Sequence, residues 1–256
     1  MHARSNSIDP REVRHYDQLA KTWWDKSGPF WPLHRLNTLR TGYIQSQLCR
    51  HFGLAADSLA PLKGLTVLDV GCGGGILAES MARLGARVLG IDVVEKNIAI
   101  ARQHAADSGL KIDYRLTTAE SLASSGQMFD VVLNMEVVEH VSDLPGFMAA
   151  VSKLLKPGGM MFVATINRTA LAWLVAIVAA EYILRWMPKG THRWEMFRQP
   201  GEIKNQLAVN GLMVKDLVGV GVNPLRKHMF LTRLKSVNYM LTASHALSTI
   251  SDSPPL

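Results

Sequence analysis

The sequence of 256 residues is short of cysteine, of Lys/Arg blocks and of any apolar segment at its N-terminus. Its two cysteines, Cys49 and Cys72, stand in unrelated surroundings, which excludes a disulfide framework and a cysteine zinc site and predicts a reducing compartment. No apolar run follows the first basic residues, so we expect no secretory signal. No Lys/Arg block is interleaved with aromatic residues, and we therefore expect no nucleic-acid partner.

Composition favours one globular domain with a large core. Hydrophobic residues make up 48% of the chain and charged residues 19%. The net charge is +7 and the sequence pI is about 9.5, a balance that suits an anionic surface. Because nucleic acid is disfavoured, we expect this surface to be anionic phospholipid.

The chain is organised around a strand, a glycine loop, a helix and a second strand. Residues 65–70 are an apolar, β-branched run that predicts a buried strand, and Gly71, Gly73 and Gly75 follow at alternating positions. Such glycines permit a tight turn and leave backbone N–H groups open to a ligand. The next apolar strand ends in Asp92, 21 positions after Gly71, where a carboxylate accepts the hydroxyls of a ribose.

The glycines alone leave two cofactors open. The dinucleotide pattern fails when read from Gly71, because Ile76 replaces a small residue, but it is retained when read from Gly73 with Ala78. Asp69 shifts the balance, since a carboxylate there repels a pyrophosphate and attracts the ammonium and sulfonium of S-adenosylmethionine. The pattern D-x-G-x-G-x-G resembles the first motif of class I methyltransferases, and we expect S-adenosylmethionine as the methyl donor.

Strands and helices continue to alternate up to Thr165, as in an α/β, Rossmann-like doubly wound class I methyltransferase sheet. Residues 117–120 are expected to form a loop beside the adenine. We divide the single domain 1–256 into a helical cap over 9–64, a cofactor-binding core over 65–165, an apolar lid or membrane insert over 166–200, and C-terminal strands and a tail over 201–256.

Two carboxylates and an imidazole follow the predicted strand 129–135. Glu136, Glu139 and His140 lie at the carboxyl edge of the sheet, where the chemistry of open α/β folds is located. They could bind one divalent cation that favours a phenolate. Equally, His140 could be a general base that the two glutamates orient. Spacing leaves both interpretations open.

The segment 169–187 is unusually apolar, with Glu181 and Arg185 as its only charged residues. As a helix it would be roughly 28 Å long, but its charges and its position inside an α/β fold argue against a membrane span. We expect a helix that lies in the membrane interface. The alternative is a buried core helix.

Several further stretches resemble the ubiquinone-biosynthesis O-methyltransferases along almost the whole chain. The most specific are Pro32-Leu-His-Arg-Leu-Asn37, Glu181-Tyr-Ile-Leu184 and Pro188-Lys-Gly-Thr-His192, beside Trp23-Trp24-Asp25, the glycine-loop stretch 68–82 and Asn223-Pro224. The resemblance implies O-methylation of polyprenylated catechol-like rings, namely 2-polyprenyl-6-hydroxyphenol and 3-demethylubiquinol.

The resemblance also implies where the ligands bind. The positions that bind S-adenosylmethionine would be Arg40, Gly71, Asp92 and Met135, and Glu136, Glu139 and His140 would hold Mg²⁺ or another divalent cation. It implies a cytoplasmic enzyme, peripheral on the inner face of the bacterial cytoplasmic membrane, with other ubiquinone-biosynthesis enzymes as partners. A methyltransferase for another small hydrophobic phenol and a non-catalytic quinone- or lipid-binding module are the alternatives.

Overall fold

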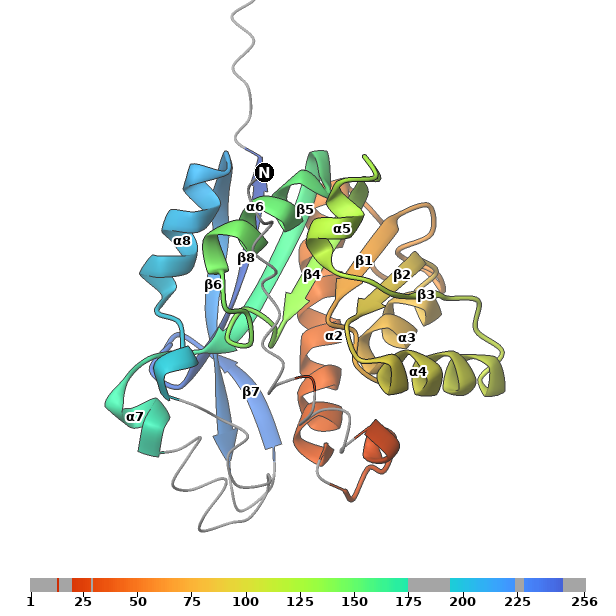
Figure 1. The fold of residues 1–256 in the computed structure, drawn as a ribbon, viewed down its shortest axis with the longest axis horizontal. Helices are drawn as coiled ribbons and strands as arrows, with labels where there is room; N and C mark the ends of the chain where they lie inside the picture. Colours follow the sequence, from red (N-terminus) through yellow and green to blue (C-terminus); the bar gives the residue numbers. More distant parts are fainter. Residues whose placement is uncertain (1–12, 14–19, 29, 175–193, 224–227, 246–256) are drawn as a thin grey trace, which may run out of the picture.

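The computed structural model describes residues 13, 20–28, 30–174, 194–223 and 228–245. Its centre is a sheet of eight strands in the order β3-β2-β1-β4-β5-β8-β6-β7 (Figure 1). The strands are β1 Thr66–Val70, β2 Arg87–Asp92, β3 Asp113–Leu116, β4 Phe129–Met135, β5 Leu155–Ile166, β6 Leu212–Asn223, β7 His228–Thr232 and β8 Asn238–His245.

The first five strands are parallel, and β1 lies between β2 and β4. The strand order reverses at this place, so a crevice forms where the carboxyl ends of β1 and β4 diverge. β8 runs antiparallel between β5 and β6, and β7 is the edge strand. The doubly wound sheet expected from the sequence is therefore confirmed over 65–165, and an antiparallel extension completes it.

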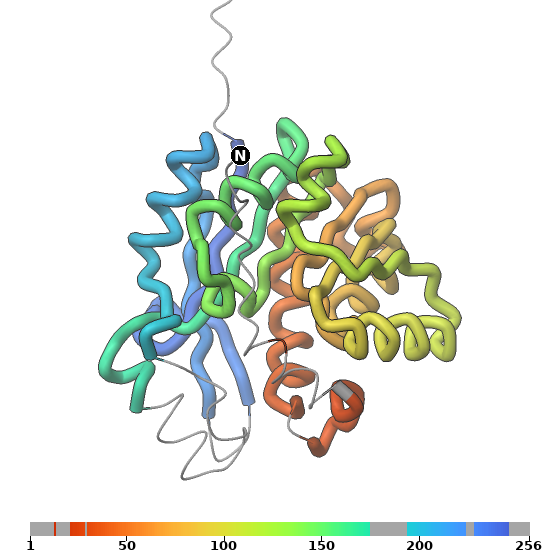
Figure 2. The backbone as a smooth tube through the Cα atoms, viewed as in Figure 1, coloured from red at the N-terminus to blue at the C-terminus, as the bar shows by residue number. Residues whose placement is uncertain are grey.

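Helices cover both faces of the sheet (Figures 1 and 2). The helical segments are η1 Ala20–Thr22, α2 Trp31–Phe52, α3 Ile76–Arg83, α4 Glu95–Asp107, α5 Ala119–Ala123, α6 Leu144–Lys153, α7 Ala170–Ala172, η3 Trp194–Met196 and α8 Pro200–Val209. Neighbouring strand residues face opposite layers: Val67 packs in the cluster with α2, α3 and α4, whereas Leu68 packs in the cluster with α5, α6 and α8. Burial of both faces explains the continuous apolar strands.

The segments 117–120 and 169–187 differ from the sequence expectations or extend beyond the described residues. Part of the loop expected at 117–120 is helical, because the Thr118 hydroxyl caps α5 by accepting from the Ser121 N–H at 3.1 Å. The apolar helix expected over 169–187 begins as α7, capped by Thr169, but residues 175–187 lie outside the described part of the chain. The same holds for residues 9–12 and 14–19 of the expected helical cap over 9–64. Within the described residues, no helix is long and apolar enough to cross a membrane.

Candidate active site

The glycine loop between β1 and α3 turns through three left-handed residues. Gly71, Gly73 and Gly75 have φ values of 66°, 53° and 89°, a region that side chains disfavour. A Cβ at these positions would also come within 2.7 Å of another side chain. The side chains in question are Val137, Trp23 and Tyr114, respectively. The glycines are thus required by packing within the protein as well as by any ligand.

Asp92, at the end of β2, fastens this loop. Its Oδ2 accepts from the Gly73 N–H at 2.9 Å, and its Oδ1 accepts from the Val94 N–H at 2.8 Å and from Asn97 Nδ2 at 3.4 Å. Burial raises the pKa of Asp92, and the hydrogen bonds from Val94 and Gly73 oppose that rise. The carboxylate expected to bind a ribose therefore also fixes the loop beside it.

Asp69 presents an unsatisfied carboxylate oxygen. The residue is 3% exposed, and its Oδ2 has no hydrogen-bond partner among the described residues. Burial raises its pKa to about 7, while the guanidinium of Arg40 lowers it and the charge of Asp92 raises it further. A buried carboxylate oxygen without a donor is costly unless a ligand compensates it. This environment fits the cationic methionine end of S-adenosylmethionine.

Arg40, on α2, connects the two halves of the site. Its Nη2 donates to Glu136 Oε1, and its buried Nε has no partner within the described part of the chain. Among the described residues, Glu136 is the only non-glycine with positive φ, at 60°. Such strain at the end of a strand is typical of functional sites.

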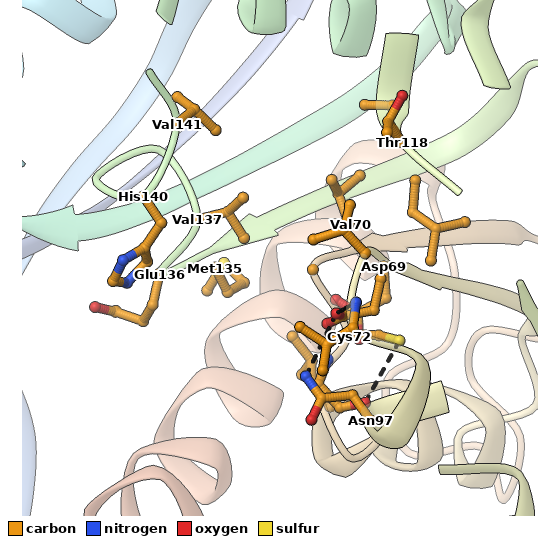
Figure 3. Close-up of a pocket in the computed structure, with 18 of the residues that line it drawn as sticks. Asp69, Val70, Cys72, Asn97, Thr118, Met135, Glu136, Val137, His140 and Val141 are labelled. Atoms are coloured by element: carbon orange, nitrogen blue, oxygen red, sulfur yellow. Dashed lines mark hydrogen bonds between the residues drawn. The ribbon is translucent and has the colours of Figure 1, made fainter. Parts of the chain in front are cut away.

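One cavity brings most of the expected residues together. Arg40, Asp69, Gly71, Gly73, Asp92, Met135, Glu136 and His140 all line it. Figure 3 shows Glu136 and His140 on one side of the cavity, with Asp69 and Asn97 on the other. The segment 117–120 also lines it, whereas Gly75 and Glu139 do not. A phenolic acceptor beside His140 would face Asp69 and Asn97 across the cavity.

Two of the three expected metal ligands have protein partners in the described part of the chain. Glu139 is 3% exposed and accepts from the Thr165 hydroxyl at 2.8 Å, while Glu136 pairs with Arg40. Burial, followed by the charge of Glu136, raises the pKa of Glu139 to about 8. No group of three His, Cys, Asp or Glu side chains that could hold a metal ion occurs among the described residues. The structure therefore gives no support to a metal at Glu136, Glu139 and His140, and their role as metal ligands stays a prediction.

Two residues of the cavity wall were not predicted as cofactor residues. Trp23, part of the stretch Trp23-Trp24-Asp25 that carries the family resemblance, packs on the glycine loop and lines the cavity. Asn97 was not considered, although a buried asparagine five positions after Asp92 is a signal of a polar role.

Comparison with known proteins agrees with this geometry. Residues 68–163 match the family described as "Methyltransferase domain". A ubiquinone biosynthesis O-methyltransferase of Sinorhizobium medicae (strain WSM419) is 52% identical over 94% of this chain and 97% of its own length. A protein with the same description from Brucella anthropi is also 52% identical, over 93% of this chain and 96% of its own length.

Among solved structures, the fold is similar to magnesium protoporphyrin IX methyltransferase from Synechocystis PCC 6803. The form with bound SAH has a TM-score of 0.61 at 17% identity and covers 92% of this chain and 99% of that one. The form with bound SAM has a TM-score of 0.59 at 16% identity and covers 94% and 100%. The similarity to these solved structures supports the fold, and the two relatives at 52% identity establish the family. The chain therefore belongs to the ubiquinone biosynthesis O-methyltransferases, within the class I S-adenosylmethionine-dependent methyltransferases.

Proposed function

We propose that this chain methylates a phenolic hydroxyl of a polyprenylated catechol-like ring, with 2-polyprenyl-6-hydroxyphenol and 3-demethylubiquinol as its substrates. One observation carries the proposal. Asp69 and Asp92 line the same cavity as Glu136 and His140, so a cation-binding side faces a side that holds a candidate base. A dehydrogenase or a non-catalytic lipid-binding module would not need this combination.

Each of these residues has a separate role in the proposed methyl transfer. S-adenosylmethionine, when bound, supplies the methyl group and leaves as S-adenosylhomocysteine. Asp69 holds the cationic methionine end, and Asp92 accepts from the ribose. An unperturbed phenol has a pKa of about 10, so its proton must be removed for attack near neutral pH. His140 takes this proton, and the phenol oxygen forms a bond to the methyl carbon as the carbon–sulfur bond breaks.

Metal dependence is a separate question. The resemblance implies Mg²⁺ or another divalent cation, but the carboxylates at 136 and 139 have protein partners and do not face one point with His140. We therefore assign no step to a metal.

The substrate class also motivates a location. Leu171, Trp173 and Leu174, at the start of the apolar insert, are 47%, 46% and 50% exposed. Exposed aromatic and aliphatic side chains of this kind suit the membrane interface, and the net charge of +7 suits anionic phospholipid. We propose that 166–200 is a lid that lies on the cytoplasmic face of the membrane, where other enzymes of ubiquinone biosynthesis would be partners.

A turnover assay tests the reaction. Wild-type protein should transfer methyl from S-adenosylmethionine to a prenylated catechol, and His140→Ala should lower turnover by about 100-fold or more while cofactor affinity is kept. Each assay is run after exhaustive chelation and again with added Mg²⁺. No methyl transfer to the catechol under either condition would contradict the proposed substrate class, and full activity in His140→Ala would contradict the base.

A further inference from the structure

Trp23 lies flat on the glycine loop. A Cβ added at Gly73 would be 2.5 Å from its six-membered ring, and one at Gly74 would be 2.5 Å from its five-membered ring. The indole also stacks on Phe30, with centroids 3.9 Å apart and planes 1° from parallel. The segment before α2 is therefore packed against the loop by a buried ring, because Trp23 is 8% exposed.

The indole also orients an amide. Trp23 Nε1 donates to Asn97 Oδ1 at 2.8 Å. An indole N–H is a donor only, so the oxygen of Asn97 must face it. The amide nitrogen of Asn97 then necessarily faces Asp92, whose Oδ1 it contacts at 3.4 Å. If the amide were reversed, its oxygen would lie against the carboxylate.

This chain of contacts decides which oxygen of Asp92 has room for a ligand. Oδ1 accepts from Val94 and Asn97, and Oδ2 accepts from Gly73. A backbone hydrogen bond from Val93 makes a smaller contribution to the same carboxylate. Oδ2 therefore has fewer of these close donors than Oδ1 and is the better acceptor for a ligand. A ribose hydroxyl bound there would depend on the rotation of the carboxylate, which Asn97 restricts.

We propose that Trp23 is a positioning residue for S-adenosylmethionine: through Asn97 it orients Asp92 so that Oδ2 accepts a ribose hydroxyl. The inference rests on the proposed binding of the ribose by Asp92. It makes the segment before α2 part of the cofactor site, although Trp23 lies 69 positions before Asp92 in the chain.

The neighbouring tryptophan provides a matched control. Trp24 Nε1 donates to the Gly74 carbonyl at 2.8 Å, and its ring stacks on His104 with centroids 3.4 Å apart. Trp24 therefore packs on the same loop through one indole hydrogen bond. Neither of these contacts involves Asn97 or Asp92.

The experiment is a double-mutant cycle on the affinity for S-adenosylmethionine, measured by isothermal titration calorimetry. Trp23→Phe keeps an aromatic ring on the glycines and removes the donor. It should weaken affinity about three- to tenfold, the effect of losing one hydrogen bond. Asp92→Asn should weaken affinity by at least as much. In the Asp92→Asn background, Trp23→Phe should have little further effect, since both changes act through one contact.

Trp24→Phe is combined with Asp92→Asn in the same way, and its effect should simply add. A thermal melt of every variant checks that the fold persists. Two results overturn the inference: Trp23→Phe with wild-type affinity, or effects of Trp23→Phe and Asp92→Asn that add as those of the control do. If Asp92→Asn itself kept wild-type affinity, the ribose placement would fail as well, which distinguishes the two failures.

Discussion

The guanidinium of Arg40 donates to the carboxylate of Glu136, joining α2 to the end of β4 across 96 positions of sequence. Arg40 is also the charge that lowers the pKa of Asp69 against the effect of burial. One buried cation therefore acts on the cofactor side and on the acceptor side of the cavity. Removal of this cation should affect both sides.

We expect Arg40→Met to weaken binding of S-adenosylmethionine about tenfold at pH 7. Without the guanidinium, the pKa of Asp69 rises further, so less of the carboxylate is charged when the cationic ligand arrives. Affinity should recover substantially at pH 9, as titration calorimetry at both pH values would reveal. Arg40→Lys, which keeps the charge, is the control and should lose less. Equal losses at pH 7 and pH 9 would contradict this explanation.

Asp69 should make the wild-type affinity depend on pH. Its pKa in the free protein is about 7, and a bound cation lowers it, so binding below pH 7 must release a proton. Affinity should therefore rise by up to about tenfold per pH unit toward pH 7 and level off above it. Asp69→Asn should bind weakly with little dependence on pH. A wild-type affinity that is constant from pH 5.5 to 8 would be inconsistent with a cation at Asp69.

The raised pKa of Asp69 also makes the stability of the ligand-free protein depend on pH. Folding raises the pKa of Asp69 from its ordinary 3.8, so the folded state favours the protonated acid. Its contribution to the free energy of unfolding is fully present below pH 3.8 and is lost as pH rises through about 7. Urea titrations of the ligand-free protein should show that Asp69→Asn gains stability relative to wild type at pH 8 but not at pH 4.

Glu139→Gln tests whether Glu139 acts as a charged metal ligand or as a buried acceptor for Thr165. The substitution keeps an oxygen that can accept from Thr165 and keeps the volume of a buried, largely neutral side chain. Turnover of a prenylated catechol at pH 7 should therefore stay within about threefold of wild type, because no charged ligand is lost. His140→Ala, assayed in parallel, should lose most activity. Loss of turnover in Glu139→Gln, together with inhibition of the wild type by a chelator, would support the metal hypothesis.

The parallel half of the fold follows from local patterns, and the other half does not. The run Phe129–Met135 is mostly apolar because strands in a sheet covered on both faces are buried on both sides, and β4 has these bounds. The insertion of β8 between β5 and β6 rests on pairings such as Phe162 with Thr242, which no local pattern reveals. Sequence spacing identifies strands but does not give their order across such long separations.

The candidate site shows the same division. Asp92 was predicted because strand, loop and acid occur within one local unit. The direction of the Glu139 side chain does not follow from the sequence. In the turn after β4 the His140 N–H donates to the Val137 carbonyl at 2.8 Å, and this turn directs the Glu139 carboxylate toward β5. Spacing brings residues near one another along the chain. The backbone turn decides which side chains converge.

The last prediction distinguishes membrane contact from burial for the start of the apolar insert. Leu171 and Leu174 are about half exposed, whereas Ala172 between them is fully buried. Figure 2 shows α7 at the same end of the sheet as the N-terminal segment that packs on the glycine loop. If this end lies on a membrane, Leu171→Glu with Leu174→Glu should lower binding to anionic vesicles at least tenfold, because burial of each leucine contributes about 1–2 kcal/mol.

The melting temperature of that double variant should change little, since both side chains already contact solvent. Val209→Glu is the matched control: Val209 ends α8, is 82% exposed, and should tolerate the charge with no loss of vesicle binding. The measurement is co-sedimentation with anionic and with neutral phospholipid vesicles, beside a thermal melt of each variant. Wild-type protein that ignores anionic vesicles would contradict the membrane interpretation. A double variant that unfolds would instead place this segment in a core, because buried, unpaired carboxylates cost several kcal/mol.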